Sequence, residues 1–324
     1  MKLIRAAALV AGLSAAPACL AETLTVETGT PSGLTTLAMQ VIATYGDLDL
    51  QINSGQTLTR ACLKAGMGEI DVSICPPPAM GAMAKGVGPY KDVADDAKAA
   101  YQNLRGLFAF SAGFFHAIVK ADSGIEDWED AFGTRIFTGP PAGSANGQSQ
   151  AIILAASGMK AGEDYEAVNL GWGAGLQAFQ DGQFEVFMRP APIGVSVVEQ
   201  LGPIRLLSLS EEAQESQAWK DYTAQESRFA GTIPAGTYAN AVNEDDVTVA
   251  EYSMQAAVHA DMDDETAYQL TKQFWDNLDA AKADIKALAG IDAEQPFIGM
   301  NIPLHPGAVR YYQEIGVDIP KERM

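Results

Sequence analysis

The side chains most often used in catalysis are sparse in this sequence. Its three histidines, His116, His259 and His305, are far apart, and none lies in a pair with the spacing of a zinc site. The sequence also lacks a nucleophile elbow, a Walker lysine and a C-x-x-C pair. We therefore predict no catalytic residue, no metal site and no cofactor, and we expect a protein that is not an enzyme. The rival hypothesis, a secreted α/β hydrolase or transferase, would need a nucleophile beside one of these histidines.

Three loops of small residues lie where predicted strands end and helices begin. They cover residues 28–33, 53–57 and 141–146, and each offers hydroxyl, amide or backbone N–H groups beside a helix N-terminus. Such donors can hold a carboxylate or a phosphate without a full positive charge. Ordinary N-capping by Ser, Thr and Asn is the alternative for each loop. The candidate ligand contacts in these loops are Thr30, Ser32, Asn53, Ser54, Gly55, Gly143, Ser144 and Asn146.

Arg189 is the charged residue most clearly placed for binding. Residues 184–190 put it at the carboxyl end of an apolar strand, where the ligand crevice of an open α/β sheet lies. A guanidinium there can clamp a carboxylate through two hydrogen bonds, and a salt bridge to a nearby Asp or Glu is the alternative. Trp172 also follows a predicted strand, so it is expected either to line the pocket or to pack between helix and sheet.

The elements that position these residues alternate between strands and helices. A first β-α series is predicted over residues 24–28, 34–45, 48–52, 57–65 and 70–75. A second series is predicted over residues 133–139, 148–157, 167–170, 174–180, 185–189 and 204–209. Two long extended stretches, 104–120 and 247–259, link the two series, and a helix is predicted over 264–287. This order predicts two α/β lobes with a hinge of two strands.

The composition excludes several classes of partner. The chain has 324 residues, with 41 Asp and Glu against 21 Lys and Arg, so its formal net charge is −20. Nucleic-acid backbones and anionic lipid surfaces are bound through clustered Lys and Arg, so neither is expected as a partner. Apolar residues make up 48% of the chain, which is enough for a packed core in each of two lobes.

Residues 1–21 have the pattern of a secretory signal peptide. Lys2 and Arg5 precede a short apolar stretch, and Cys19 and Ala21 are the small residues expected at a cleavage site. We expect cleavage after Ala21, a periplasmic location, and a mature net charge of −22. Two cysteines then remain, Cys62 and Cys75, which either form a disulfide or stay as two buried free thiols.

Several motifs, in order behind the signal pattern, resemble those of the TAXI family of periplasmic solute-binding proteins, which serve TRAP transporters. In chain order they are G-E-I-D-V (68–72), D-S-G-I (122–125), G-S-A-N (143–146), D-G (181–182) and I-P-A-G-T-Y (233–238). The most specific motif is P-L-H-P-G-A (303–308) near the C-terminus, which is followed by R-Y-Y (310–312) and Gly316.

The resemblance implies a periplasmic-binding-protein-like fold with two α/β lobes, mixed sheets and a two-strand hinge. Lobe 1 is expected over residues 22–119 plus 240–324, and lobe 2 over residues 120–239. It further implies a receptor that captures a small organic acid, either a carboxylate or an amino acid, for the TRAP membrane permease subunits. We expect it to act as a monomer. The same receptor fold serving an ABC importer or a membrane sensor is the alternative. In this comparison His305 is a structural residue of the C-terminal motif.

The candidate pocket departs from the family pattern at three edges. The first loop has Pro31 and Ser32 where the family has G-G-T followed by tyrosines, and the second lacks the G-S-x-x-N spacing. At the third edge, Cys75 and residues 76–78 form a Pro-rich segment that we expect to be a rigid turn, because proline has no N–H to donate. Pro77 is the candidate contact there. Arg189 is expected to compensate as the anchor of the carboxylate.

Overall fold

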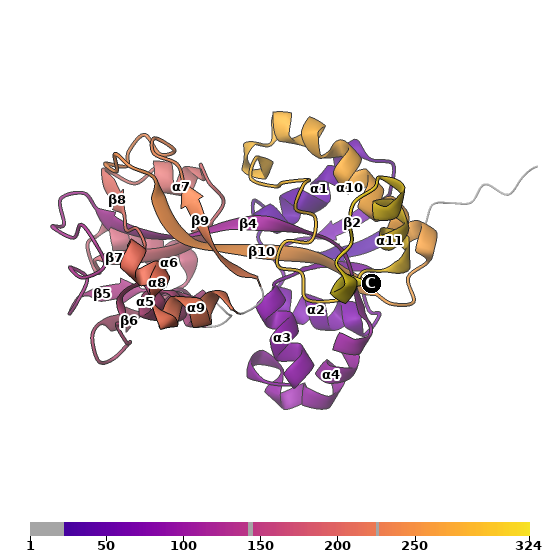
Figure 1. The fold of residues 1–324 in the computed structure, drawn as a ribbon, viewed down its shortest axis with the longest axis horizontal. Helices are drawn as coiled ribbons and strands as arrows, with labels where there is room; N and C mark the ends of the chain where they lie inside the picture. Colours follow the sequence, from indigo (N-terminus) through magenta and orange to yellow (C-terminus); the bar gives the residue numbers. More distant parts are fainter. Residues whose placement is uncertain (1–22, 142–144, 225–226) are drawn as a thin grey trace, which may run out of the picture.

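The computed structural model describes residues 23–141, 145–224 and 227–324, which form two lobes (Figure 1). The predicted signal peptide lies outside the described residues. One lobe gathers the first strands and helices of the chain together with its C-terminal part, and the other gathers the middle of the chain. Two long strands, β4 (Leu104–Lys120) and β10 (Val247–His259), run through both lobes. The predicted fold class, two α/β lobes joined by two strands, is confirmed.

The first lobe is built on three short parallel strands in the order β2-β1-β3. They are followed by helices at the predicted places, because apolar residues recur there at helical spacing. The elements are β1 (Leu24–Glu27), α1 (Leu34–Tyr45), β2 (Leu50–Asn53), α2 (Leu58–Gly66) and β3 (Val72–Cys75). Helices α1 and α10 (Asp264–Asp284) pack together on the upper side in Figure 1, and α2 lies on the lower side.

The Pro-rich segment after β3 is not the rigid turn that the sequence suggested. Pro77 instead begins a helix, α3 (Pro77–Lys85), with Pro76 as its N-cap. Proline is well suited to the first turn of a helix, because an N–H there has no intrahelical partner and the ring fixes φ near the helical value. Two further helices that pattern reasoning did not predict, α4 (Ala94–Gln102) and α11 (Pro306–Glu314), complete this lobe.

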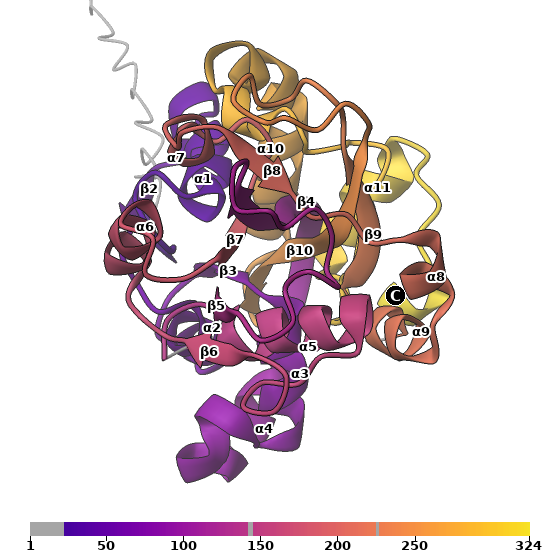
Figure 2. The same ribbon diagram turned by 90° about the vertical axis from the view of Figure 1, so that its left-hand side faces the viewer.

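The second lobe places three strands in the order β7-β5-β6, with all three parallel. Helices α5, α8 and α9 lie on one side of this sheet, and α6 and α7 lie on the other (Figure 2). The strands are β5 (Arg135–Phe137), β6 (Glu166–Val168), β7 (Val186–Ala191), β8 (Ile204–Leu206) and β9 (Arg228–Ile233). The helices are α5 (Ala145–Ser157), α6 (Trp172–Gln180), α7 (Ser196–Glu199), α8 (Glu211–Glu215) and α9 (Gln217–Thr223).

Strands β4 and β10 change partners where they pass from one lobe to the other. They pair with each other in the first lobe, and β10 also pairs with β3. In the second lobe β4 pairs with β7 and β8, whereas β10 pairs with β9. The register between β4 and β10 shifts at Tyr252 and Ser253, opposite Gly113 and Ser111. A second register shift falls between Gln255 and Ala257, within the first lobe, so the β4–β10 ladder is irregular both at the hinge and just beyond it.

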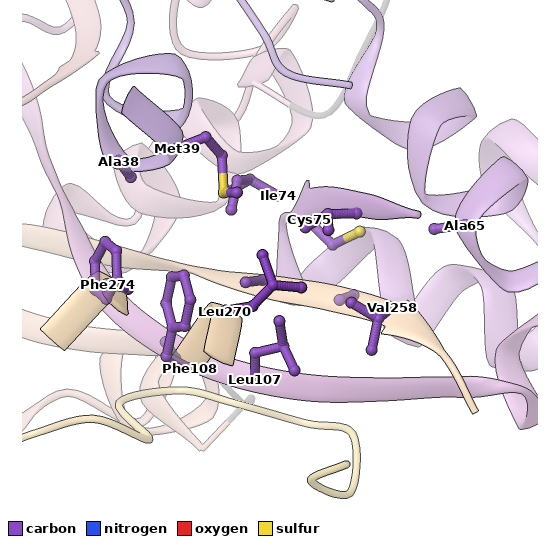
Figure 3. Packing of buried hydrophobic residues seen from close by; sticks show 14 of the residues in the cluster. Ala38, Met39, Ala65, Ile74, Cys75, Leu107, Phe108, Val258, Leu270 and Phe274 are labelled. Atoms are coloured by element: carbon purple, nitrogen blue, oxygen red, sulfur yellow. The ribbon is translucent and has the colours of Figure 1, made fainter. Parts of the chain in front are cut away.

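The hydrophobic cores change at the same place. The large core of the first lobe takes β4 residues up to Ala112, and it includes Phe108 stacked on Phe274 with ring centroids 3.9 Å apart (Figure 3). From Phe114 onward, β4 contributes to two cores on the two faces of the second sheet. On β10 the change falls between Ala250 and Ala256. Each lobe thus has its own core, and only the hinge strands belong to both.

Cys62 of α2 and Cys75 at the end of β3 are joined by a disulfide, with their Cα atoms 5.7 Å apart. Both cysteines are fully buried in the core of the first lobe. The bond ties α2 to the end of β3, directly before Pro76 and the start of α3.

Replacing both cysteines by serine should lower the free energy of unfolding by about 3 kcal/mol, because the bond closes a short loop in the unfolded chain. Denaturant unfolding of the Cys62→Ser/Cys75→Ser variant and of the oxidised wild type would measure this difference. Wild type kept in reductant serves as the control and should behave like the variant. Equal stability of all three would show that the bond does not constrain the fold.

His116 on β4 is a buried core residue, as its apolar surroundings predict. Its Nε2 lies 2.8 Å from the Tyr238 hydroxyl, and its Nδ1 lies 3.0 Å from the carbonyl oxygen of Phe114. Burial lowers the pKa of His116 from its usual 6.5 to about 4, because the charged imidazole would lose its hydration. The ring is therefore neutral in the folded protein at pH 7.

This buried ring should make the fold sensitive to mild acid. The unfolded chain takes up a proton on His116 near pH 6.5, whereas the folded chain does so only near pH 4, so stability is lost as the pH falls between these values. Between pH 7 and pH 5 the loss from this residue should be about 2 kcal/mol. Denaturant unfolding at the two pH values should show a correspondingly smaller difference for His116→Gln. An unchanged pH dependence in His116→Gln would refute the assignment.

Candidate functional site

The directions of the strands bring the ends of two strand sets face to face. Strands β3 and β4 are both antiparallel to β10, so β1, β2 and β3 run in the direction of β4, toward the second lobe. Strand β7 is antiparallel to β4, and β5 and β6 are parallel to β7, so these three run toward the first lobe. The carboxyl ends of both sets therefore point to the region between the lobes, where ligand sites of α/β sheets are found.

In the first lobe the two predicted loops are hydrogen-bonded to each other. The Thr28 N–H donates to the carbonyl oxygen of Asn53 over 3.1 Å, and the Gln56 N–H donates to that of Thr28 over 2.9 Å. The structure thus brings Thr30 and Ser32 of one loop beside residues 53–55 of the other. Thr30, Ser32 and Gly55 are exposed, and Asn53 and Ser54 are half-buried.

The helices at these strand ends begin without side-chain caps. Helix α1 starts after Gly33, α2 after Thr57 and α6 after Gly171, and none of these described N-cap residues accepts a side-chain hydrogen bond from the first turn. Helices α8 and α9, by contrast, are capped by Ser210 and Ser216. Ordinary N-capping therefore does not account for the first two loops. The positive ends of the α1 and α2 helix dipoles therefore lie at these strand ends.

Pro77 is buried at the first turn of α3, and it is tied to the hinge strand. The Asn301 side-chain amide donates to the carbonyl oxygen of Pro77 over 2.9 Å. Asn301 in turn accepts a hydrogen bond of 2.7 Å from the side chain of Gln255 on β10. Through this chain of contacts the third strand end of the first lobe is fixed to β10.

In the second lobe a side-chain network holds the strand ends together. The Thr138 hydroxyl after β5 donates to the Asn146 Oδ1 over 2.8 Å, and Gln150 donates to the same oxygen over 2.8 Å. Asn169 after β6 donates to Thr138 Oγ1 over 3.0 Å and to the carbonyl of Gly139 over 2.9 Å. The oxygen of Asn146 thus holds the loop. Gly143 and Ser144, also predicted as contacts, lie outside the described residues.

Sequence reasoning does not single out Thr138 and Asn169, because the predicted strands 133–139 and 167–170 include both residues. In the structure β5 and β6 end earlier, so Thr138 directly follows β5 and Asn169 directly follows β6. Their role is visible only because β5 and β6 are neighbours in the sheet, which brings the two strand ends within hydrogen-bonding distance.

Arg189 and Trp172 meet at the carboxyl ends of β7 and β6. The guanidinium carbon of Arg189 lies 5.0 Å from the ring centroid of Trp172, which is a cation-π contact. Trp172 is the first residue of α6 and packs edge-on against Phe137 of β5, with ring centroids 5.7 Å apart. The ring thus packs on the sheet, which is the second alternative for Trp172, and it also contacts the cation.

The charge of Arg189 has no partner within the described chain. Arg189 makes no ion pair with any carboxylate of the described residues, and its buried Nε has no hydrogen-bond partner among them. Burial lowers the pKa of Arg189, while the nearby Tyr252 raises it, and an arginine stays charged at neutral pH. A half-buried cation without a counter-ion costs stability, and it stands out in a chain of net charge −20. The alternative of a salt bridge therefore finds no support here.

The two clearest cavities of the described residues lie elsewhere. The larger, of about 600 Å³, is at the opposite end of the second lobe, where α6 ends and presents its carbonyl groups. Lys120 already donates to one of these, the carbonyl of Gln180, over 3.1 Å. The smaller, of about 210 Å³, is at the hinge and includes Glu251 and Asp292 in its lining. Neither lining includes Arg189 or the predicted loop residues.

Two α/β lobes that are joined by two strands, with strand ends facing each other between them, form the fold of periplasmic solute-binding proteins. A model of the NMT1-like family matches residues 60–316, and the chain belongs to that family. The family and its structural neighbours are non-enzymatic solute-binding proteins.

Solved structures of solute-binding proteins share this fold at low sequence identity. The putative periplasmic sulfonate-binding protein SsuA of Methylobacillus flagellatus is 9% identical, with a TM-score of 0.50 over 93% of this chain and 80% of that one. The aliphatic sulphonate binding protein SsuA of Escherichia coli is 13% identical, with a TM-score of 0.48 over 93% and 90% of the two chains. A TRAP periplasmic solute binding protein of Rhodobacter sphaeroides is 12% identical, with a TM-score of 0.45 over 91% and 95%.

The described residues offer neither a metal site nor a membrane-spanning helix. They contain no group of three or more His, Cys, Asp or Glu side chains arranged to hold a metal ion. No helix in residues 23–141, 145–224 or 227–324 has both the length and the apolar character that crossing a membrane requires.

Proposed function

We propose that this protein is a periplasmic receptor that binds a small organic acid between its two lobes and delivers it to a TRAP-type permease. The ligand lies between the carboxyl ends of β1–β3 and those of β5–β7. Arg189 binds its carboxylate, Trp172 forms an apolar wall, and the uncapped first turns of α1 and α2 supply backbone N–H donors.

The observation that carries this proposal is the unpaired charge of Arg189. A half-buried guanidinium loses hydration that its contact with a tryptophan ring offsets only in part, unless an anion neutralises it. An anionic ligand supplies that partner, and it does so locally, against the overall negative field of the protein. The remaining predicted contacts, from Thr30 and Ser32 to residues 53–55, belong to the facing lobe and would close on the other side of the ligand.

Closure of the lobes about β4 and β10 is part of the proposal. We place the two crossing points near Gly113 and Tyr252, where partners, register and cores all change. These points lie several residues from the predicted boundaries at 119 and 240. Among the described residues, β4 and β10 are the two strands that cross between the lobes there, which suits a hinge motion of rigid bodies.

The TRAP assignment rests on the TAXI-like motifs of the sequence. Uptake of the ligand by cells that depend on this receptor should then stop when the sodium and proton gradients are collapsed. It should continue, while those gradients last, when ATP is depleted. The opposite pattern would place the receptor with an ABC importer.

A thermal-shift screen of the mature chain with small carboxylates and amino acids tests the ligand class. A ligand at a hundred times its dissociation constant adds about 2.7 kcal/mol to stability, a rise of several degrees in melting temperature. The matched control for each acid is its uncharged amide. An acid that stabilises the protein while its amide does not supports the proposal. If no acid shifts the melting temperature, or if the amides act equally, the anion site is wrong.

A further inference from the structure

The end of β7, where Arg189 lies, has few backbone donors of its own. Pro190 and Pro192 follow Arg189, and a proline brings no N–H to a strand ladder. Across the ladder, Arg189 lies opposite His116 of β4, and Pro190 lies opposite Phe115. The segment that carries Arg189 therefore depends more than an ordinary strand end on hydrogen bonds from side chains.

His116 supplies one of these hydrogen bonds. Its Nδ1 lies 3.2 Å from the carbonyl oxygen of Arg189 and 3.0 Å from that of Phe114. Carbonyl oxygens only accept hydrogen bonds, so Nδ1 carries the proton of the neutral ring and Nε2 is left as an acceptor. The tautomer of His116 is thus assigned by two carbonyl groups, one of which belongs to Arg189 itself.

Tyr238 completes the network on the other side of the imidazole. Its hydroxyl lies 2.8 Å from Nε2 of His116 and accepts a hydrogen bond of 3.1 Å from the N–H of Gly194. Burial raises the pKa of Tyr238 to about 12, so the hydroxyl keeps its proton and donates it to Nε2. One buried hydroxyl therefore joins β4 to the segment that follows β7.

This network gives a role to a sequence motif that the proposed function leaves unexplained. Tyr238 is the last residue of I-P-A-G-T-Y (233–238), and the Thr237 N–H and hydroxyl both donate to the carbonyl oxygen of Pro234, which closes a turn. Beyond this turn the Tyr238 ring is 2% exposed and packs edge-on against the imidazole, with ring centroids 5.6 Å apart. A buried hydroxyl costs free energy unless it is paired, and its partners here are His116 and the segment after β7.

We infer that Tyr238 and His116 are positioning residues of the anion site. Tyr238 fixes the imidazole, and the imidazole fixes the carbonyl group of Arg189, so that the guanidinium is held over Trp172. The inference rests on the proposed function and extends it, because both residues are buried and act on the ligand through Arg189. The alternative is a purely structural role, in which the network adds only to the stability of the second lobe.

The test is a double-mutant cycle of Tyr238→Phe and Arg189→Met. Each variant is titrated calorimetrically with the small carboxylate that gives the largest thermal shift and with the amide of that acid. Tyr238→Phe keeps the buried ring and removes only the hydroxyl. It should weaken the acid about 10-fold and leave the weaker binding of the amide unchanged, because only the acid needs the aimed charge of Arg189. In the Arg189→Met background the same change should have no further effect.

Tyr165→Phe is the matched control. Tyr165 is another buried tyrosine of the second lobe, and its hydroxyl has no hydrogen-bond partner among the described residues. Its replacement should leave the acid-to-amide ratio of affinities at the wild-type value. His116→Asn and His116→Leu form a second pair of variants. The asparagine amide can replace the Nδ1 donor and should retain more of the ratio than leucine, which has no donor.

Each contrary outcome identifies what is wrong. If Tyr238→Phe lowers the melting temperature of the ligand-free protein but keeps the wild-type acid-to-amide ratio, the network is structural and the inference is wrong, while the proposed function stands. The same holds if Tyr238→Phe weakens the acid equally with and without Arg189, or if both His116 variants keep the wild-type ratio. If the wild type binds no acid more tightly than its amide, the proposed function fails and the inference fails with it.

Discussion

Arg189→Met should weaken binding of the organic acid about 30- to 1000-fold while leaving the ligand-free protein at least as stable as the wild type. The loss of affinity follows because the carboxylate would be left in a partly buried site without its counter-charge. The gain or neutrality in stability follows because the ligand-free protein no longer keeps an unpaired cation over Trp172. This opposite effect on binding and on stability is typical of a binding residue and not of a structural one.

Calorimetric titration and thermal unfolding of the same samples would measure both quantities. Arg135→Met is a suitable control, because Arg135 begins β5 at the end of the sheet away from the proposed site and is paired with Glu166 over 3.6 Å. It should leave affinity unchanged. Arg189→Lys should have an intermediate affinity, since an ammonium group cannot form the two-pronged contact. If Arg189→Met bound the acid with wild-type affinity, Arg189 would not be the anchor of the carboxylate.

Gly113→Ala should destabilise the protein more than any other addition of a single methyl group in the hinge. Gly113 has φ of +128°, a conformation that residues with a β-carbon rarely adopt. The added carbon would also overlap the carbonyl group of Ala191 and lie 2.7 Å from the nitrogen of Pro192. It would thus push against the end of β7, two residues beyond Arg189. We expect a loss of about 3 kcal/mol or more, a melting temperature lower by about 6 °C or more, and weaker ligand binding.

Gly124→Ala separates the cost of the backbone conformation from the cost of the steric overlap. Gly124 has φ of +80°, but nothing lies within 4 Å of a carbon added there. Its replacement should therefore cost only the backbone strain, about 1 kcal/mol, and leave affinity unchanged. Thermal unfolding of the two variants side by side would show the difference. Equal losses at both positions would mean that β4 and β7 are not closely packed at the hinge.

The sequence predicts well those features that depend on local pattern. The long apolar stretches 104–120 and 247–259 are the two hinge strands with the predicted bounds, because such continuous runs suit strands buried on both faces. The pattern points to Arg189 at the carboxyl end of one predicted strand and to Trp172 just after another, and parallel strands bring their carboxyl ends together. The strand-end rule therefore located one wall of the candidate site without knowledge of the sheet order.

Features that depend on contacts between distant segments could not be predicted in this way. Arg228 lies in β9, a strand of six residues that includes Gly231. This strand forms because it pairs with β10. The hydrogen bond between Asn169 and Thr138 forms because β5 and β6 are neighbours in the sheet. Adjacent prolines suit both turns and the first turn of a helix, so the sequence does not distinguish the two at Pro77. The helix α3 is favoured because apolar residues after Pro77 are buried in the core.

The most direct test of the central claim is a calorimetric comparison of an acid with its own amide. The mature chain is unfolded, dialysed free of bound solute and refolded, and it is then titrated with the carboxylate that gives the largest thermal shift. We predict one bound acid per chain and an affinity for the uncharged amide that is at least about 30-fold lower. Equal affinity for acid and amide would contradict an anion receptor anchored by Arg189.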